Sequence, residues 1–141
     1  MGKWTHVSKS ERVNFTWRTL SATPSAAEKF VPQGLTFIDG YLYLAESHDD
    51  KIGIVYKIDP NKNANNIISK FQLPANAVHT SGLAWDGSHL WAVDYSSKKL
   101  YQIDLVESVK NKAAVVIQSF DTGLVGASAI TIFDWQGQKY L

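Results

Sequence analysis

The chain contains no cysteine, so neither a disulfide framework nor thiolate chemistry is open to it. Charged residues make up only 19% of the 141 residues, and the formal net charge is +1. This balance gives no electrostatic basis for binding nucleic acid or an anionic membrane surface. No apolar run reaches the length of about 18 residues that a membrane span requires. The first residues also lack the apolar core of a signal peptide, so we expect a cytoplasmic protein by default.

What the chain does contain suits one packed domain. Hydrophobic residues make up 45% and aromatic residues 12%, which argues against disorder. A chain of 141 residues is long enough to bury a single core. The sequence has no Gly-x-Ser-x-Gly elbow, no phosphate-binding loop and no His-Glu-x-x-His motif. Composition therefore predicts a globular protein without naming an activity.

An internal repeat is the most informative feature of the sequence. Residues 81–105 repeat a pattern that residues 33–60 already use, and a third copy follows. Aligned on Leu35, Leu83 and Ile130, the copies are 48 and 47 residues apart, a period typical of β-propeller blades. Each of these anchors follows a small residue, namely Gly34, Gly82 and Ala129.

Turn signals divide each copy into short strands. Asp39-Gly40 and Asp86-Gly87 supply the positive φ that a two-residue hairpin needs, and Gln136-Gly137 is a looser version. The segments after these turns are rich in aromatic and β-forming residues. Third and fourth strands are predicted at 52–58, 67–73, 100–103 and 114–120. The pattern therefore predicts an all-β protein whose blades have four antiparallel strands, a to d from axis to rim.

Counting strands gives an incomplete set of blades. Full blades are predicted at about 34–73 and 82–120, strands a and b of a further blade at about 128–141, and strands c and d at 1–20. The single domain 1–141 then holds three blade equivalents, fewer than the roughly four to eight of closed propellers. We predict a homodimer with a six-bladed ring, in which the N-terminal strands pair with the exposed edge strand of the other chain. The alternative is a fragment of a longer propeller, or another oligomer.

Residues 82–94 read Gly-Leu-Ala-Trp-Asp-Gly-Ser-His-Leu-Trp-Ala-Val-Asp, and 100–104 read Leu-Tyr-Gln-Ile-Asp. These segments resemble blades of the six-bladed propellers that include NHL-repeat proteins and gluconolactonase-like hydrolases. Pro-Gln-Gly-Leu at 32–35, followed by Asp-Gly-Tyr-Leu-Tyr at 39–43, is also similar to the five-bladed glutamine cyclotransferase family. The likeness covers about residues 30–141 and implies blade architecture. From the gluconolactonase-like group it also implies a channel metal, held by acidic and amide side chains from several blades.

Polar residues gather in the loops that would face the central channel of a propeller. These candidate ligand-binding residues are Gln33, Glu46, Ser47, His48, Asp49, His79, Thr80, Ser81, Asp94, Tyr95 and Ser128. Glu46 and Asp94 recur at the same repeat position and are the candidate metal ligands, for calcium or a similar divalent cation. The alternative for both carboxylates is hydrogen bonding to nearby backbone. For the polar cluster Glu46-Ser47-His48-Asp49-Asp50, the alternative to metal binding or acid–base chemistry is a solvated turn.

Two functional hypotheses follow. The first is a binding module that holds a small molecule, glycan or protein at the mouth of the channel. The second is a metal-dependent lactonase-type hydrolase, in which His79 is either a general base or a polar lining residue. Trp85 and Trp91 are predicted to pack between blades, as repetition at equivalent positions indicates. Trp135 is predicted to be exposed and available to a ligand or partner.

Overall fold

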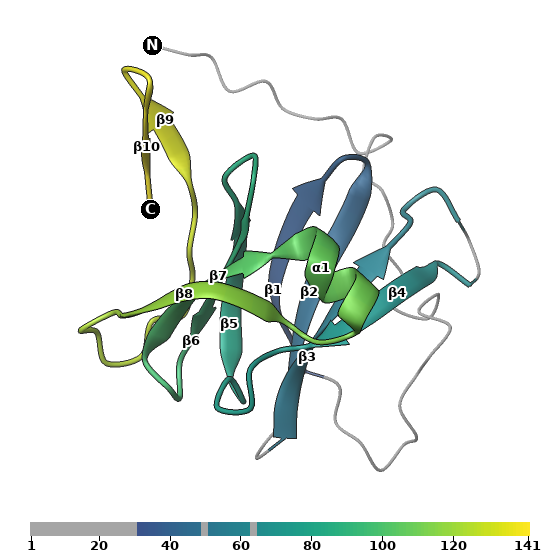
Figure 1. Ribbon diagram of the computed structural model, residues 1–141, viewed down its shortest axis with the longest axis horizontal. Coiled ribbons are helices and arrows are strands. Elements are labelled where there is room, and N and C mark those ends of the chain that lie inside the picture. Colours follow the sequence, from purple (N-terminus) through teal and green to yellow (C-terminus); the bar gives the residue numbers. More distant parts are fainter. Residues whose placement is uncertain (1–30, 49–50, 63–64) are drawn as a thin grey trace, which may run out of the picture.

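The computed structural model describes residues 31–48, 51–62 and 65–141 (Figure 1). The strands predicted within 1–20 lie outside these ranges, as does the candidate residue Asp49. Strands dominate the described residues, so the prediction of an all-β fold is confirmed for this part of the chain. The elements are β1 (Val31–Ile38), β2 (Tyr41–His48), β3 (Lys51–Ile58), β4 (Ile67–Gln72), β5 (Thr80–Trp85), β6 (Leu90–Asp94), β7 (Lys99–Asp104), α1 (Leu105–Asn111), β8 (Val115–Asp121), β9 (Phe133–Trp135) and β10 (Gln138–Tyr140).

The strands form two four-stranded antiparallel sheets and a separate hairpin. Both sheets run in simple chain order, β1-β2-β3-β4 and β5-β6-β7-β8, and β9 pairs with β10. Figure 1 shows the two sheets side by side and the hairpin standing apart from them. Each predicted blade segment of the described chain thus corresponds to one sheet or to the hairpin.

The repeat reappears in the strand pairing of the two sheets. Pro32 pairs with Glu46 in the first sheet, and Thr80 pairs with Asp94 in the second. In both sheets the register then shifts by a β-bulge before the glycine that precedes the anchor residue. Glu46 and Asp94 therefore occupy the same structural position in successive sheets.

Gly34 and Gly82 mark the points where successive copies touch. A Cβ atom on Gly34 would lie 2.8 Å from the backbone nitrogen of Leu83, and one on Gly82 would lie 2.9 Å from that of Ile130. Backbone atoms cannot yield to such contacts without displacing a strand, so a side chain is excluded at both positions. The glycines before the first two anchors are therefore explained by close approach between β1, β5 and the segment leading to β9.

Two of the three predicted turns are tight hairpins. Asp39 and Gly40 have φ values of 48° and 85°, as a two-residue turn requires. Gln136 and Gly137 have φ values of 52° and 76° and also link directly paired residues, so this turn is as tight as the first. The expectation of a looser connection at Gln136-Gly137 is wrong, because glutamine adopts the left-handed conformation there.

The third turn is wider than predicted. Trp85 pairs with Leu90, so four residues connect β5 to β6. The Asp86 carboxylate accepts hydrogen bonds from the backbone N–H groups of Ser88 and His89, each at 2.7 Å. The prediction of a two-residue Asp86-Gly87 turn is wrong because these side-chain bonds stabilise a longer loop.

The main core lies between the two sheets. Its buried members are Ile38, Tyr43, Ala45, Val55, Phe71, Leu73, Ala77, Leu83, Leu90, Ala92, Tyr101, Ile103 and Leu105, and Trp85 packs against them. Apolar residues on alternate positions of facing strands supply this layer. A smaller cluster, formed by Leu44, Tyr56 and Ile58, lies on the other face of the first sheet.

The helix α1 was not predicted, although its start carries a recognisable signal. Asp104 caps the helix, because its Oδ1 accepts the backbone N–H of Glu107 at 3.0 Å. The spacing Asp-x-x-Glu is the sequence mark of such a cap. Lys112 ends the helix in the left-handed conformation, with φ of 57°.

The residues after α1 tie the second sheet to the outer edge of the first. The Gln72 N–H donates to the Lys112 carbonyl at 3.1 Å, and the Ala114 N–H donates to the Gln72 carbonyl at 2.7 Å. Gln72 and Ala113 thus form a parallel bridge beside β4. We call this bridge the edge tie.

Candidate functional site

Buried polar side chains gather at one end of the two sheets, where β1 and β5 begin and β2 and β6 end. Of the eight buried polar residues in the described ranges, five are among the candidate site residues, namely Glu46, Ser47, Thr80, Ser81 and Asp94. We call this end of the sheets the polar end. Because a buried polar group is costly unless it is hydrogen-bonded, the partners of each residue decide its role.

Asp94 holds the backbone of the polar end together. Its side chain is fully buried; Oδ2 accepts the His79 N–H at 2.7 Å and Oδ1 accepts the Ser97 N–H at 2.7 Å. The Thr80 hydroxyl donates a longer bond of 3.4 Å to Oδ2. Charge-assisted bonds to two separate loop segments give this carboxylate a bracing role.

Glu46 has a different partner at the equivalent position. The Tyr56 hydroxyl donates to Glu46 Oε2 at 2.6 Å, and both residues are buried. The interpretation of this segment as a solvated turn is wrong for Glu46 and Ser47, because β2 continues through His48 and buries both. The Ser47 hydroxyl is buried and finds no hydrogen-bond partner among the described residues.

His79 and Tyr95 form the accessible part of the polar end. Their rings meet edge to face, with centroids 6.1 Å apart, and the Tyr95 N–H donates to the His79 carbonyl at 2.9 Å. Tyr95 is half exposed, with an exposed fraction of 49%. Its ring lies against Gly126, where an added Cβ would come within 2.6 Å of it. The tyrosine ring is therefore held from one side and open on the other.

The remaining candidate residues are placed less centrally. The Ser81 hydroxyl donates to the Ala127 carbonyl at 2.7 Å, which binds the segment before β9 to β5. Gln33 and Ser128 are exposed. His48 ends β2, and nothing is described of its side chain. The structure therefore brings His79, Thr80, Asp94 and Tyr95 together.

The candidate metal ligands do not converge on a shared site. Across residues 31–48, 51–62 and 65–141, no group of three or more His, Asp or Glu side chains could hold a metal ion. Glu46 and Asp94 lie on different sheets, each with its own hydrogen-bond donors. Carboxylates engaged in this way have little capacity left for a cation that prefers six or more oxygen ligands.

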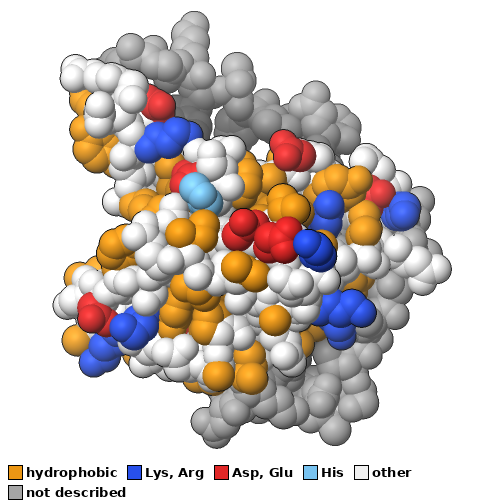
Figure 2. Space-filling view, viewed as in Figure 1, with side chains coloured by type: hydrophobic (Ala, Val, Ile, Leu, Met, Phe, Trp, Pro, Cys, Tyr) orange, Lys and Arg blue, Asp and Glu red, His pale blue; other side chains and the backbone are white. Residues whose placement is uncertain are grey.

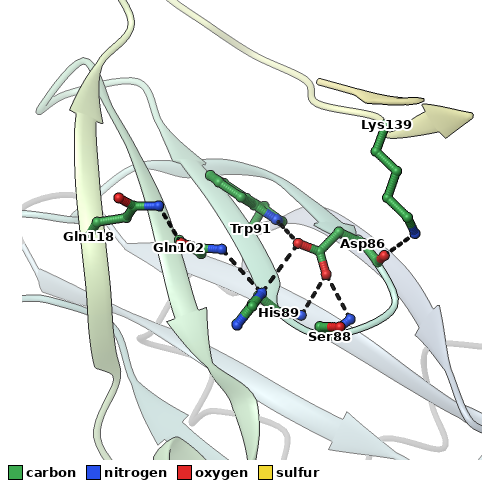
Figure 3. Close-up of polar contacts among 7 residues, drawn as sticks. All are labelled: Asp86, Ser88, His89, Trp91, Gln102, Gln118 and Lys139. Carbon is green, nitrogen blue, oxygen red and sulfur yellow. Dashed lines mark hydrogen bonds and ion pairs between the residues drawn. The ribbon is translucent and has the colours of Figure 1, made fainter. Parts of the chain in front are cut away.

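A second polar cluster, not anticipated from the sequence, lies on the face of the second sheet that points away from the first (Figure 3). Trp91 Nε1 donates to Asp86 Oδ2 at 2.7 Å, and His89 Nδ1 lies 3.4 Å from the same oxygen. His89 Nδ1 also lies 3.1 Å from Gln102 Nε2, and Gln118 donates to Gln102 at 2.6 Å. The cluster thus crosses β6, β7 and β8.

Hydrogen bonding controls the ionisation of Asp86 in this cluster. Partial burial acts to raise the pKa of the carboxyl group, but bonds from Trp91, His89 and Ser88 outweigh it and lower the pKa below its ordinary value. Lys139 of β10 donates to the Asp86 backbone carbonyl and so ties the hairpin to this loop. The signal that the sequence offered here was the Asp-Gly pair, which favours a turn.

The face of the molecule in Figure 2 carries charged side chains of both signs, scattered among hydrophobic ones. A hollow of about 330 Å³ lies between β4 and the end of α1, and is lined by Ile54, Lys70, Phe71, Gln72 and Lys112. The described part of the chain has no helix long and apolar enough to span a membrane.

No family model matches this chain, and a comparison with curated proteins finds no relative.

Proposed function

We propose that the two sheets and the hairpin are successive blades of a β-propeller, with β1 and β5 nearest the central axis. Two features support this architecture. Both sheets are four-stranded antiparallel meanders. In addition, Gly34 and Gly82 bring the first strand of each copy against the next copy. Innermost strands that touch in succession are what a radial arrangement of blades requires. The polar end then lies at one mouth of the channel.

The function that we propose is binding of a small polar ligand, such as a glycan, at this mouth. The observation that carries the proposal is the half-exposed Tyr95 ring beside His79, on backbone that the buried Asp94 carboxylate braces. A tyrosine ring offers an apolar face and a hydroxyl, and an imidazole offers a donor and an acceptor. Together they suit a sugar ring, and their rigid support limits the entropy lost on binding.

A metal-dependent lactonase-type hydrolase is less well supported. Glu46 already accepts a hydrogen bond from Tyr56, and Asp94 accepts backbone N–H groups on both of its oxygens. A calcium site built on these two carboxylates would have to break bonds that stabilise the sheets. The binding module requires no such rearrangement.

We further propose that two chains complete one six-bladed ring. In the ranges that the structure describes, β10 pairs only with β9, so its other edge is open to a further strand. An isolated two-stranded hairpin is only marginally stable, which favours its completion by additional strands. The strands expected to complete it, within residues 1–20, lie outside the described residues.

Ligand titration tests the proposed function. Maltose, cellobiose and chitobiose are each added to the full chain, and binding is followed by saturation-transfer NMR. We expect binding of at least one disaccharide, its loss in Tyr95→Ala, and its retention in Tyr95→Phe, which keeps the ring. Binding by Tyr95→Ala at the strength of the unmodified chain, or no binding of any disaccharide, contradicts the proposal. A rise in melting temperature with calcium that Asp94→Asn abolishes would instead favour the hydrolase.

A further inference from the structure

The contact between the two sheets defines two kinds of surface. The first sheet contributes one face, which includes Tyr43 of β2, and we call it the forward face. The second sheet contributes the opposite face of the repeat, which includes Leu83 of β5, and we call it the rear face. In this contact a forward face of one copy therefore packs against the rear face of the next.

On the rear face of the first sheet, the described side chains of the inner strand β1 are exposed, whereas Leu44 of β2 on the same face is buried. Leu35 occupies the position in the first sheet that Leu83 occupies in the second. Leu35 pairs with Leu44 of β2, and Leu83 pairs with Ala92 at the same place in β6. Leu83 has an exposed fraction of 4%, whereas Leu35 has one of 58%. Phe37, the next residue on the same face, is exposed by 60%. Large apolar side chains at this level of exposure on adjacent positions are typical of an interface.

The forward face of the hairpin is exposed in the same way. Tyr140 is the third residue after its turn, as Tyr43 is in the first sheet, and Trp91 holds the equivalent position in the second. Tyr43 and Trp91 are buried, with exposed fractions of 4% and 8%, whereas Tyr140 has one of 45%. Trp135 beside the turn is also exposed, and the ring of Phe133 stacks on Tyr140 at 5.3 Å.

We infer that the occupant of both exposed faces is a second copy of this chain. Among the described residues, Leu35 and Phe37 are exposed on the rear face of the first sheet, and Trp135 and Tyr140 are exposed on the forward face of the hairpin. These are the two kinds of face that pack together within the molecule, so each is the complement of the other. Figure 1 shows β1 and the β9–β10 hairpin on separate parts of the chain.

Two chains satisfy both faces at once. The hairpin of each chain covers the first sheet of the other, so the two contacts are identical and the assembly closes instead of growing into a filament. Within the described residues the hairpin does not cover the first sheet of its own chain, because Leu35 and Phe37 are exposed, as are Trp135 and Tyr140. This inference rests on the proposed blade architecture and adds to it the faces that join the chains.

Charged substitutions and a mixing experiment test the inference. Light scattering on the full chain is expected to give twice the mass of a single chain. Leu35→Glu and Trp135→Glu are each expected to give a single-chain mass. Each variant places a charged side chain on one of the two faces in every forward-to-rear contact. Val106→Glu, at an exposed position on α1, is the matched control and should keep the double mass.

Mixing distinguishes a forward-to-rear contact from any other dimer. Leu35→Glu keeps a good forward face and Trp135→Glu keeps a good rear face, so an equimolar mixture should recover association through one intact contact. The double variant Leu35→Glu, Trp135→Glu should not associate with the unmodified chain. A single-chain mass for the unmodified protein, or no recovery in the mixture, overturns the inference.

A cysteine experiment covers the case in which the charged variants do not fold. The chain has no native cysteine, so Phe37→Cys and Trp135→Cys introduce one thiol each. Oxidation of the mixed variants is expected to give a disulfide-linked pair of unlike chains, whereas Val106→Cys with either variant should not. Absence of this crosslink overturns the inference. If the unmodified chain has a single-chain mass in light scattering but still binds a disaccharide, only the inferred interface is contradicted. The proposed binding function is then unaffected, because its test depends on Tyr95.

Discussion

The two sheets come from one repeat, yet the same structural position carries out different tasks in each. In the first sheet Glu46 accepts a hydrogen bond from a tyrosine hydroxyl on the adjacent strand. In the second sheet Asp94 is one methylene shorter and instead accepts backbone N–H groups from His79 and Ser97. The repeat therefore determines where a buried carboxylate lies, whereas its side-chain length and its local neighbours determine which hydrogen-bond donors it accepts from.

The anchor leucines should show the largest difference between the sheets. Leu83→Ala is expected to lower the free energy of unfolding by about 2–5 kcal/mol, because it empties a buried core position. Leu35→Ala should cost less than about 1 kcal/mol in the dissociated chain, since the side chain already faces solvent there. Urea unfolding followed by tryptophan fluorescence measures both values. If Leu35→Ala and Leu83→Ala lowered the unfolding free energy equally at low protein concentration, the side chain of Leu35 would be as buried as that of Leu83, and the prediction would be wrong.

The buried carboxylates should give the next largest effect. Asp94→Ala leaves the N–H groups of His79 and Ser97 without their acceptor, which is expected to cost about 2–4 kcal/mol of unfolding free energy. Asp94→Asn keeps one acceptor oxygen and should lose less. Thermal and urea unfolding of the two variants provide the comparison. An Asp94→Ala variant as stable as the unmodified protein would remove the bracing role.

The Asp-Gly turns should give the smallest difference, and this difference should disappear at low pH. Because the pKa of Asp86 is lowered in the folded chain, its stabilising effect is present above its ordinary value of about 3.9 and is lost as pH falls through the lowered value. Asp86→Asn should therefore be less stable than the unmodified chain near neutral pH, with the gap closing in acid. Asp39→Asn, at the exposed turn of the first sheet, is the control. Urea unfolding across the acidic range measures the gap, and one that widens in acid contradicts this assignment.

Much of the strand order could be predicted from the sequence, because turn residues and small residues recur with the repeat. The glycines at 34 and 82 recur because backbone approaches backbone there, and such a constraint leaves a visible mark in the sequence. The bonds of Asp86 left no such mark, since an Asp-Gly pair is compatible with both a two-residue turn and a wider loop. The helix α1 was missed although its capping residues were present, because strand periodicity on both sides concealed seven residues of helix.

The candidate site was only partly predictable for a related reason. The sequence predicts acidic and histidine side chains at one end of the sheets, and the described residues Glu46, His79 and Asp94 lie at that end. Hydrogen-bond donors on the adjacent strand and in the following loop decide whether a carboxylate is available, and Tyr56 and Ser97 could not be assigned that role by spacing alone. Gly126 is likewise required by the Tyr95 ring, which a single sequence does not indicate.

The edge tie bears on how the chain unfolds. Repeated units that meet only through side chains can melt one after another, as in linear repeat proteins. Here backbone hydrogen bonds from Lys112 and Ala114 reach across to Gln72, so the outermost strand of the first sheet is completed by residues that belong to the second. Opening one sheet therefore exposes unpaired backbone in the other. The two sheets are expected to unfold in one cooperative transition and to exchange their protected amide hydrogens together.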